Sequence, residues 1–242
     1  EPGGIRRGAG VLGGFAGAAM AKAGTAAIIP SGWVLPILGI VISPLLGMAL
    51  GLGLSVALSW LLRDQPARPL EALFRRLQLV SAGLYSLSHG SNDAQKTMGI
   101  IVGLLVASQD LFAGRDGLLG MMHLTSLDHV PLWVEFAAYG AIAMGTALGG
   151  WRIVRTMGTR ITKLQPFGGF CAETGGALTI LFASSLGVPV STTHTITGAI
   201  VGVGASKRLA AVRWAVAGRI VWAWILTIPA AAVIAAVCYW IL

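Results

Sequence analysis

Charged residues are scarce in this chain. They make up 11% of its 242 residues, whereas 55% are hydrophobic, and a soluble domain carries roughly 25% charged residues. The mean hydropathy is +0.79. These values exclude an ordinary water-soluble domain, and we expect an all-α, polytopic membrane protein for which lipid is the solvent. The 34 glycines suit closely packed or interrupted membrane helices.

Signals of several other protein classes are missing. Cys171 and Cys238 stand alone in apolar stretches without a Cys-x-x-Cys spacing, so neither a disulfide nor a cysteine metal site is expected. The net charge is +8, but no basic face is interleaved with aromatic residues, which excludes nucleic acid as a partner. No signal peptide pattern opens the chain, and its start at Glu1 instead of Met is what we expect of a fragment or truncated gene product. No cofactor is expected.

Long hydrophobic runs predict where the chain crosses the bilayer. The runs expected to cross are residues 34–62, 79–108, 132–151 and 214–242. The run 11–23 is too short to cross a hydrocarbon core of about 30 Å by itself, and Pro44 is expected to kink the first crossing helix. From residue 70 to 84 the apolar positions recur at helical spacing, which predicts an interfacial helix that continues into the membrane.

Charge distribution predicts the topology. Three positive clusters are expected on the cytoplasmic side by the positive-inside rule, at residues 63–76, 152–163 and 207–213. The acidic loop 109–131 is expected outside. Segment 166–206 then starts and ends on the cytoplasmic side, and its second arm, 195–205, is too short to span. A re-entrant helical hairpin with its tip at 189–193 satisfies both constraints, and the last span places the C-terminus outside.

Polar residues interrupt the predicted crossing at 79–108, beginning at Ser88. Burying such groups in lipid is costly unless they are paired. We interpret Gly90 as a break, after which Asn92 or Asp93 caps a half-helix whose free N–H groups face an anion. The Asp93 carboxylate, the Asn92 amide and freed carbonyls also suit a hard cation such as Na⁺. The alternative is a cytoplasmic loop with a helix cap.

A second interruption follows Pro189. The hydroxyls of Ser191, Thr192 and Thr193 precede a short helix, so they can cap it and donate hydrogen bonds to an oxyanion, while the helix dipole adds positive potential. The alternative is a simple N-cap on a solvated turn. His194 is either a packed, hydrogen-bonded residue or a proton relay.

Ionisable residues elsewhere in the apolar segments are further candidates. Glu173 lies in the first arm of the hairpin, and an acid there is a functional-site hypothesis by default. It either binds or relays a coupling cation or faces water near the entrance of the arm. Lys96 can pair with Asp93 or with Glu173, or attract an anion. Three other polar residues are expected to be interfacial or solvated, namely Glu135, His123 and His129.

Two interrupted, hydroxyl-rich elements in one bundle indicate a secondary-transporter site. A different class, an intramembrane hydrolase, would use Ser191 as nucleophile and His194 as base. The chain has no Gly-x-Ser-x-Gly elbow, and no third residue is placed to orient the histidine. We therefore expect a carrier and not an enzyme.

The polar motifs resemble those of a known family. Residues 88–99, SHGSNDAQKTMG, resemble the second-repeat signature of the inorganic phosphate transporter (PiT) family. Residues 172–174, 187–194 and 198–204 resemble that family's second hairpin. The resemblance extends from about residue 13 to the end of the chain. It implies one half of an inverted-repeat fold, with phosphate and coupling cations bound where the repeats meet.

By motif position, the resemblance also implies roles for individual residues. Phosphate would be bound by Asp93, Ser191, Thr192 and Thr193. The coupling cation would be bound by Asn92, Asp93 and Glu173, with no metal other than Na⁺ at Asn92 and Asp93. Supporting residues would be Ser91, Gln95, Lys96, Thr97 and His194.

The resemblance divides the chain into four parts. Residues 1–10 are irregular and outside the family pattern, 11–32 end the first-repeat hairpin, 33–80 form a long transmembrane helix plus a cytoplasmic amphipathic helix, and 81–242 form the second-repeat transport unit. The implied function is symport of inorganic phosphate, free or as a metal–phosphate complex, with H⁺ or Na⁺ across the cytoplasmic membrane.

Two alternatives to this function remain. This chain lacks two motifs of the first repeat, the Asn-Asp motif and the hydroxyl-His tip. In one case the chain still transports, by itself or as a homo-oligomer. In the other it is an incomplete half that needs an N-terminal partner. A carrier of another oxyanion, such as sulfate, would use the same dipoles and hydroxyls.

Overall fold

The computed structural model describes residues 9–28, 30–149, 156–188 and 190–241. Within them the chain is helical and contains no β-strand, which confirms the all-α prediction. Ala9 and Gly10 already belong to the first helix. Several sequence predictions lie partly outside the described residues: the irregular stretch 1–8, the end of the crossing at 150–151, the positive residues 152–155, Pro189 at the hairpin tip, and Leu242.

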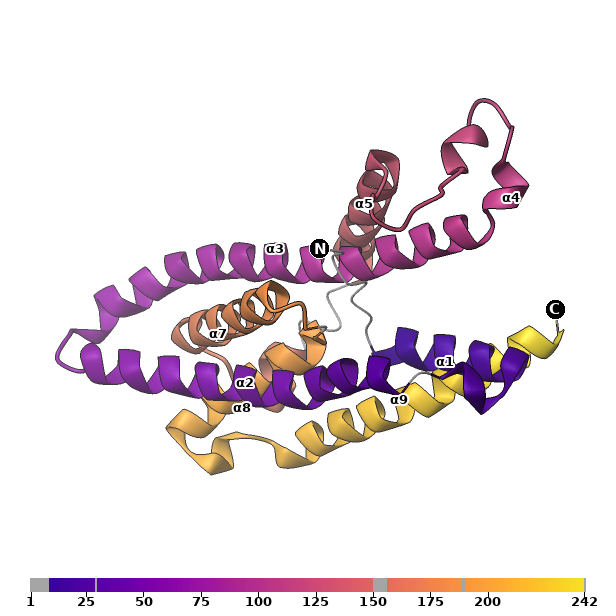
Figure 1. The fold of residues 1–242 in the computed structure, drawn as a ribbon. Helices are drawn as coiled ribbons and strands as arrows, with labels where there is room; N and C mark the ends of the chain where they lie inside the picture. The colour runs from indigo at the N-terminus through magenta and orange to yellow at the C-terminus, as the bar shows by residue number, and fades with distance from the viewer. Residues whose placement is uncertain (1–8, 29, 150–155, 189, 242) are drawn as a thin grey trace.

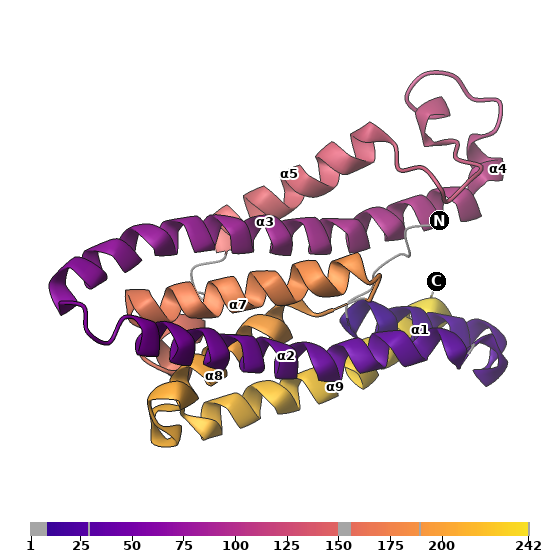
Figure 2. The ribbon, with the colours of Figure 1, turned by 60° about the vertical axis from the view of Figure 1, so that its left-hand side comes forward.

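Figure 1 shows the order and arrangement of the elements. The α-helices are α1 Ala9–Ala23, α2 Ser31–Leu61, α3 Ala67–Ala107, α4 Gln109–Phe112, α5 Leu132–Gly149, α7 Pro166–Ser185, α8 Thr192–Lys207 and α9 Trp214–Ile241. Short helical turns of other types are η1 Thr25–Ala27, η2 Gly120–Met122, η3 Thr156–Ile161 and η4 Leu209–Ala211. Both Figure 1 and Figure 2 show α7 lying between α3 and α2.

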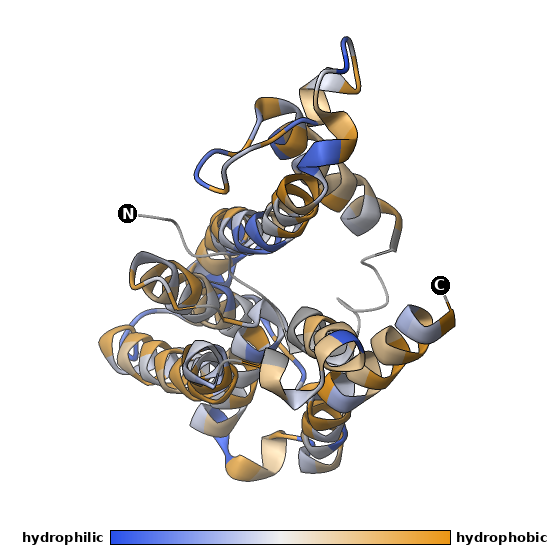
Figure 3. Cartoon of the chain, turned by 45° about the vertical axis from the view of Figure 1, so that its right-hand side comes forward, coloured by the Kyte–Doolittle hydropathy of each residue, from blue (hydrophilic) through white to orange (hydrophobic). Residues whose placement is uncertain are grey.

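Two of the described helices, α2 and α9, are long and apolar enough to cross a membrane. They coincide with the predicted crossings at 34–62 and 214–242, and α2 continues as a helix through Pro36 and Pro44. Large side chains on the outer face of α9, such as Trp222, Ile225 and Ile234, are exposed. Figure 3 shows that hydrophobic residues dominate the helices. Lipid is the solvent that such faces require.

Helix α3 corrects the sequence-based prediction of a break. It runs without interruption for 41 residues from Ala67 to Ala107, so neither Asn92 nor Asp93 caps a half-helix. Gly90 is not among the glycines with positive φ. The Ser88 hydroxyl donates to the Leu84 carbonyl, at 2.6 Å, within the same helix. Polar groups therefore interrupt the hydrophobicity of α3 but not its backbone, because most of them find hydrogen-bond partners within α3 or on neighbouring segments.

The predicted helical hairpin is present. Helix α7 ends at Ser185, Gly187 turns the chain with φ +72°, and α8 begins at Thr192 beside α7. Helix α8 is 16 residues long and starts three residues earlier than the predicted second arm. At about 1.5 Å per residue it remains shorter than a full crossing requires. Its entry into and return from a membrane stay a prediction.

Small residues allow α8 to lie directly against α2. Gly47 of α2 faces the backbone of Thr195, and Gly198 and Gly202 of α8 face the backbone of Pro44 and Met48. A Cβ atom at any of these glycines would overlap a carbonyl oxygen of the other helix. Membrane helices associate through such close packing, because in lipid the hydrophobic effect does not drive them together. This contact places the N-terminus of α8 against the middle of the bundle.

Candidate functional site

One face of α3 carries a stripe of polar side chains. Polar residues recur along it every three or four positions, with two adjacent pairs, which places them on one side of the helix: Gln78, Ser81, Tyr85, Ser88, His89, Asn92, Asp93 and Lys96. Their side-chain hydrogen bonds reach α7, the segment that follows it and the first turn of α8. The stripe, and not a break in the helix, positions the candidate site.

The carboxylate of Asp93 is the centre of this site. Its Oδ1 atom accepts a hydrogen bond from Lys96 Nζ at 2.8 Å, and its Oδ2 atom lies 3.0 Å from His89 Nε2. Oδ2 also lies 3.4 Å from the hydroxyl of Thr192 on α8. These three neighbours hold the Asp93 side chain in place. It is nevertheless 34% exposed, so a ligand can still reach it.

Lys96 joins α3 to the tip of the hairpin. Its side chain is 10% exposed, and Nζ donates to the Val190 carbonyl at 3.1 Å as well as to Asp93. The sequence left open whether Lys96 pairs with Asp93 or with Glu173, and in the structure it pairs with Asp93. A buried ammonium group is stable only with such partners.

The first turn of α8 presents hydroxyls and free N–H groups beside Asp93. Ser191 is the N-cap, and its Oγ accepts from the His194 backbone N–H at 3.5 Å. The Thr192 carbonyl accepts from the Tyr85 hydroxyl at 3.2 Å. Thr193 is exposed. The predicted cap is thus present, and the structure brings Thr192 to Asp93.

Asn92 has an oxygen that lacks a partner within the described part of the chain. The side chain is 2% exposed; its Nδ2 lies 3.4 Å from Ser184 Oγ, whereas Oδ1 is buried and accepts no hydrogen bond there. Leaving a buried acceptor unsatisfied costs about 1–3 kcal/mol. Oδ1 is therefore a natural ligand for a cation or for a donor on a bound molecule.

Glu173 lies apart from this site. It accepts a hydrogen bond from Ser81 at 2.6 Å and another from Gln78. From Ser81 to Asp93, α3 rises roughly 18 Å at 1.5 Å per residue. The structure therefore does not bring Glu173 to Asn92 and Asp93, which are neighbours on α3, so the three cannot share one cation in this conformation.

The imidazole of His194 is packed inside the bundle. It is 4% exposed, stacks on Trp224 of α9 with ring centroids 3.7 Å apart, and is hydrogen-bonded to the backbone of Ile40. The Ser191 hydroxyl accepts a hydrogen bond from the backbone N–H of His194 and not from its ring. The nucleophile–base contact that a hydrolase would need is not made.

The remaining predicted residues lie at the edge of the site. Gln95 and Thr97 are exposed, and Ser91 is half-buried. The Thr97 hydroxyl donates to the Asp93 carbonyl at 3.3 Å, a contact within the helix. Among the described residues no group of three or more His, Cys, Asp or Glu side chains is arranged to hold a metal ion.

Sequence reasoning missed several residues that the structure places in contact with the predicted ones. His89 and Tyr85 contact Asp93 and Thr192, Ser81 contacts Glu173, and Ser184 contacts Asn92. The spacing of the polar residues would have revealed the first three. If Gly90 is interpreted as a break, the residues before and after it are not expected to share one helix face, so the stripe cannot be predicted.

A comparison with protein families decides which one this chain resembles. The model of the phosphate transporter family matches residues 62–235, which is more than half of the chain. This chain belongs to the phosphate transporter family. The sequence resemblance is thereby confirmed, and the similar proteins are named as transporters and permeases.

Relatives of this phosphate transporter family member are found in several organisms. A Rhizobium meliloti protein named "Probable low-affinity inorganic phosphate transporter" is 53% identical over 95% of this chain and 65% of its own length. A Bacillus subtilis protein of the same name is 39% identical over 96% of this chain and 66% of its own length. The chain thus spans slightly less than two thirds of these relatives.

A solved structure titled "The sodium-dependent phosphate transporter" resembles the fold of this family member. The TM-score is 0.59 with 26% sequence identity, and the match covers 96% of this chain and 64% of the other. Because nearly the whole chain is matched, the arrangement of helices described above resembles that of part of this solved transporter.

Replacing Lys96 by methionine is expected to loosen the hairpin tip. The substitution keeps much of the side-chain volume but removes the Nζ bonds to Asp93 and to the Val190 carbonyl. Hydrogen bonds to charged groups contribute about 1.5–3 kcal/mol, so a cysteine placed at the buried position Val190 should be alkylated about tenfold faster or more. The exposed Cys238 is replaced by serine for this measurement.

The matched control for this experiment is Gln95→Met, one residue away on the exposed side of α3. It should leave the alkylation rate at position 190 unchanged. Equal rates in the Lys96 variant and the unaltered protein would show that Lys96 does not hold the tip.

Proposed function

We propose that this chain provides the phosphate- and cation-binding unit of a secondary carrier, which moves inorganic phosphate across the cytoplasmic membrane by symport with H⁺ or Na⁺. The observation that carries the proposal is the contact between Asp93 and the first turn of α8. It brings an acid, a helix N-terminus and a row of hydroxyls to one place. Family membership supports phosphate as the anion.

The first turn of α8 suits an oxyanion. Helix N-termini bind phosphate through free N–H groups and the positive end of the helix dipole. We assign Ser191, Thr192 and Thr193 to this role, with their hydroxyls as additional donors. Asp93 would accept a hydrogen bond from a protonated phosphate oxygen. Sulfate carries no such proton at neutral pH and would be repelled, so this carboxylate favours phosphate over sulfate.

Charge balance at Asp93 gives a physical basis for coupling. The carboxylate is already paired with Lys96, and a second negative charge about 4 Å away would be repelled by about 4 kcal/mol at an effective dielectric constant near 20. A cation bound by Asp93 and the Asn92 oxygen would offset this repulsion. Phosphate and cation would then bind best together, which is the differential affinity that symport requires.

Glu173 would serve the cation at a separate position on the path. Its carboxylate is half-buried between α7 and α3 and bonded to Ser81. An acid inside a membrane bundle is a candidate for cation or proton relay. We assign Ser91, Gln95, Lys96, Thr97 and His194 supporting roles, Lys96 through its contact with the hairpin tip.

The proposed topology has helices α2, α3, α5 and α9 crossing the bilayer and α7–α8 forming a re-entrant hairpin. The positive residues between α2 and α3 and after α8 would face the cytoplasm, which places the C-terminus outside. Helix α3 is roughly 60 Å long at 1.5 Å per residue, twice the hydrocarbon thickness. Its first turns, rich in arginine, would therefore lie outside the hydrocarbon region.

Phosphate uptake into proteoliposomes tests the proposal. Because the chain spans 65% of the R. meliloti relative, uptake is measured for the chain alone and for the chain joined to the unmatched part of that relative. We expect an inward Na⁺ or H⁺ gradient to raise the initial rate roughly tenfold or more, and the effective gradient names the cation. Activity only in the joined form would show that the chain holds part of the site.

Competition distinguishes the substrate from other oxyanions. A large excess of sulfate should leave phosphate uptake unchanged, because the Asp93 carboxylate has no proton to accept from it. Equal inhibition by sulfate and by unlabelled phosphate would favour a general oxyanion carrier. Uptake that no gradient stimulates, in either form, would contradict symport.

A further inference from the structure

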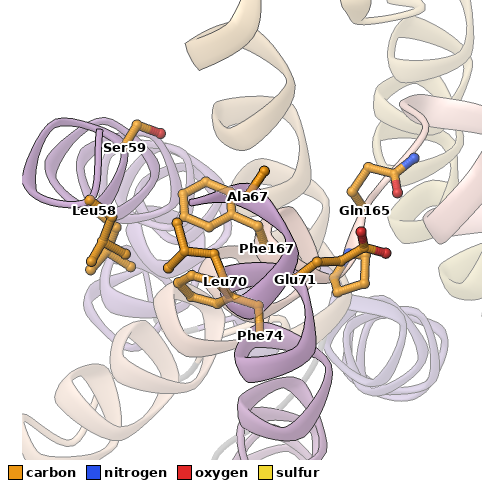
Figure 4. A pocket seen from close by; sticks show the side chains of 10 residues that line it. Leu58, Ser59, Ala67, Leu70, Glu71, Phe74, Gln165 and Phe167 are labelled. Atoms are coloured by element: carbon orange, nitrogen blue, oxygen red, sulfur yellow. The ribbon is translucent and has the colours of Figure 1, made fainter. Parts of the chain in front are cut away.

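Two adjacent cavities lie near the C-terminal end of α2 and the start of α7, far from the candidate transport site. One, of about 420 Å³, is mainly apolar and includes Leu58, Leu70, Phe74 and Phe167. Figure 4 shows the Leu70 side chain and the rings of Phe74 and Phe167 lying between Leu58 and Glu71. From Phe74 to Asp93, α3 rises roughly 28 Å, so the cavity is distinct from the transport site.

The second cavity adjoins the first and carries positive charge. It has a volume of about 560 Å³ and shares Ser59 and Phe167 with the apolar cavity. Arg63 and Lys207 line it, and none of the described residues that line it is acidic. Lys207 makes no ion pair with a carboxylate in the described part of the chain. Hydroxyl groups at Ser59 and in the Ser55–Ser206 pair line the same space.

The immediate surroundings leave the positive charge of the second cavity largely uncompensated. Arg63 has one acidic neighbour, Asp64 at 3.4 Å, and both side chains are mostly exposed, so their attraction is screened by water. Glu71 at the edge of the apolar cavity is bonded to Arg75 at 2.9 Å. An anion that enters between Arg63 and Lys207 would meet two cations and several donors.

We propose that the two cavities form one binding site for an anionic phospholipid, with the headgroup phosphate between Arg63 and Lys207 and an acyl chain along the apolar cavity. A basic pocket beside an apolar groove has the charge and polarity of such a lipid. Trp60 lines the basic cavity, is 70% exposed, and lies under the Arg63 guanidinium at 5.7 Å. Tryptophan is enriched at membrane interfaces.

Native mass spectrometry of the detergent-purified chain tests the site. The protein is titrated with phosphatidylglycerol or with phosphatidylcholine that carries the same acyl chains. We expect phosphatidylglycerol to bind more tightly, and the double variant Arg63→Gln/Lys207→Gln to weaken that binding about 30-fold, because each basic residue contributes to headgroup attraction. Leu70→Trp, which fills the apolar cavity, should weaken it as well.

The matched control is Lys22→Gln/Arg115→Gln, which removes the same charge from exposed positions away from both cavities. It should leave phosphatidylglycerol binding unchanged. Equal loss in the control, or equal binding of the two lipids, would overturn the proposal. Displacement of the lipid by millimolar inorganic phosphate or glycerol 3-phosphate would also overturn it, since the cavity would then be a site for small anions.

Discussion

Asp93→Asn is expected to reduce gradient-driven phosphate uptake about 100-fold, in whichever form of the carrier is active. Asparagine keeps the shape of the side chain but removes its charge, which leaves Lys96 in a position that is 10% exposed without its counter-ion. Truncating one member of a buried charge pair costs about 2–5 kcal/mol. The substitution also replaces the charged acceptor for a protonated phosphate oxygen by an uncharged amide oxygen, which accepts more weakly. The initial rate of uptake into proteoliposomes measures the effect.

A double variant separates the structural part of this effect from the functional part. In Asp93→Asn/Lys96→Met neither charge remains, so thermal stability should recover toward that of the unaltered protein. Uptake should not recover, because the Asp93 carboxylate is still missing. Asp110→Asn, on the exposed segment after α3, is the control and should transport normally. Uptake by the Asp93 variant at the unaltered rate would remove Asp93 from the proposed mechanism.

Gly198→Ala should strongly destabilise the contact between α8 and α2. The new Cβ atom would overlap the Pro44 carbonyl oxygen and lie within 2.9 Å of two further backbone atoms of that residue. Backbone cannot move aside as a flexible side chain can, so α8 must shift relative to α2. Overpacking of this kind costs about 1–3 kcal/mol or more. We expect an unfolding midpoint in detergent about 5–10 °C lower.

Gly90→Ala provides the comparison. Gly90 also lies inside a long helix, but a Cβ atom there meets nothing within 4 Å. Alanine has the higher helix propensity by up to about 1 kcal/mol, so this variant should be unchanged or slightly more stable. If both alanine variants melt at the same temperature, the close contact between α2 and α8 does not hold in the folded protein.

Hydropathy was sufficient to predict much of the fold. The runs at 34–62 and 214–242 became α2 and α9, and the hairpin of α7 and α8 was expected because the segment between two positive clusters is too short to cross twice. Each of these inferences depends on residues that are neighbours along the chain. Their physical cause, the cost of placing charge and unpaired backbone in lipid, acts on each segment independently.

The break predicted at residues 88–93 was wrong because the outcome there depends on residues far apart along the chain. A run of polar residues inside an apolar crossing indicates either an interrupted backbone or a continuous helix with polar partners nearby. The partners are distant along the chain: Ser184, Val190 and Thr192 for the segment that holds Asn92, Asp93 and Lys96. Sequence periodicity cannot reveal which groups will satisfy a buried residue from another helix.

The sequence by itself determined that this is an all-helical membrane protein with phosphate-transporter motifs, because composition, hydrophobic run length and motif identity are properties of single segments. Tertiary structure alone decided that α3 is continuous, that Lys96 joins Asp93 to the hairpin tip, and that Glu173 stands apart from both. Those outcomes depend on how close two helices can approach, which glycines such as Gly47 and Gly198 permit. A hydrogen bond between distant segments exists only once that packing has placed its donor within about 3 Å of its acceptor.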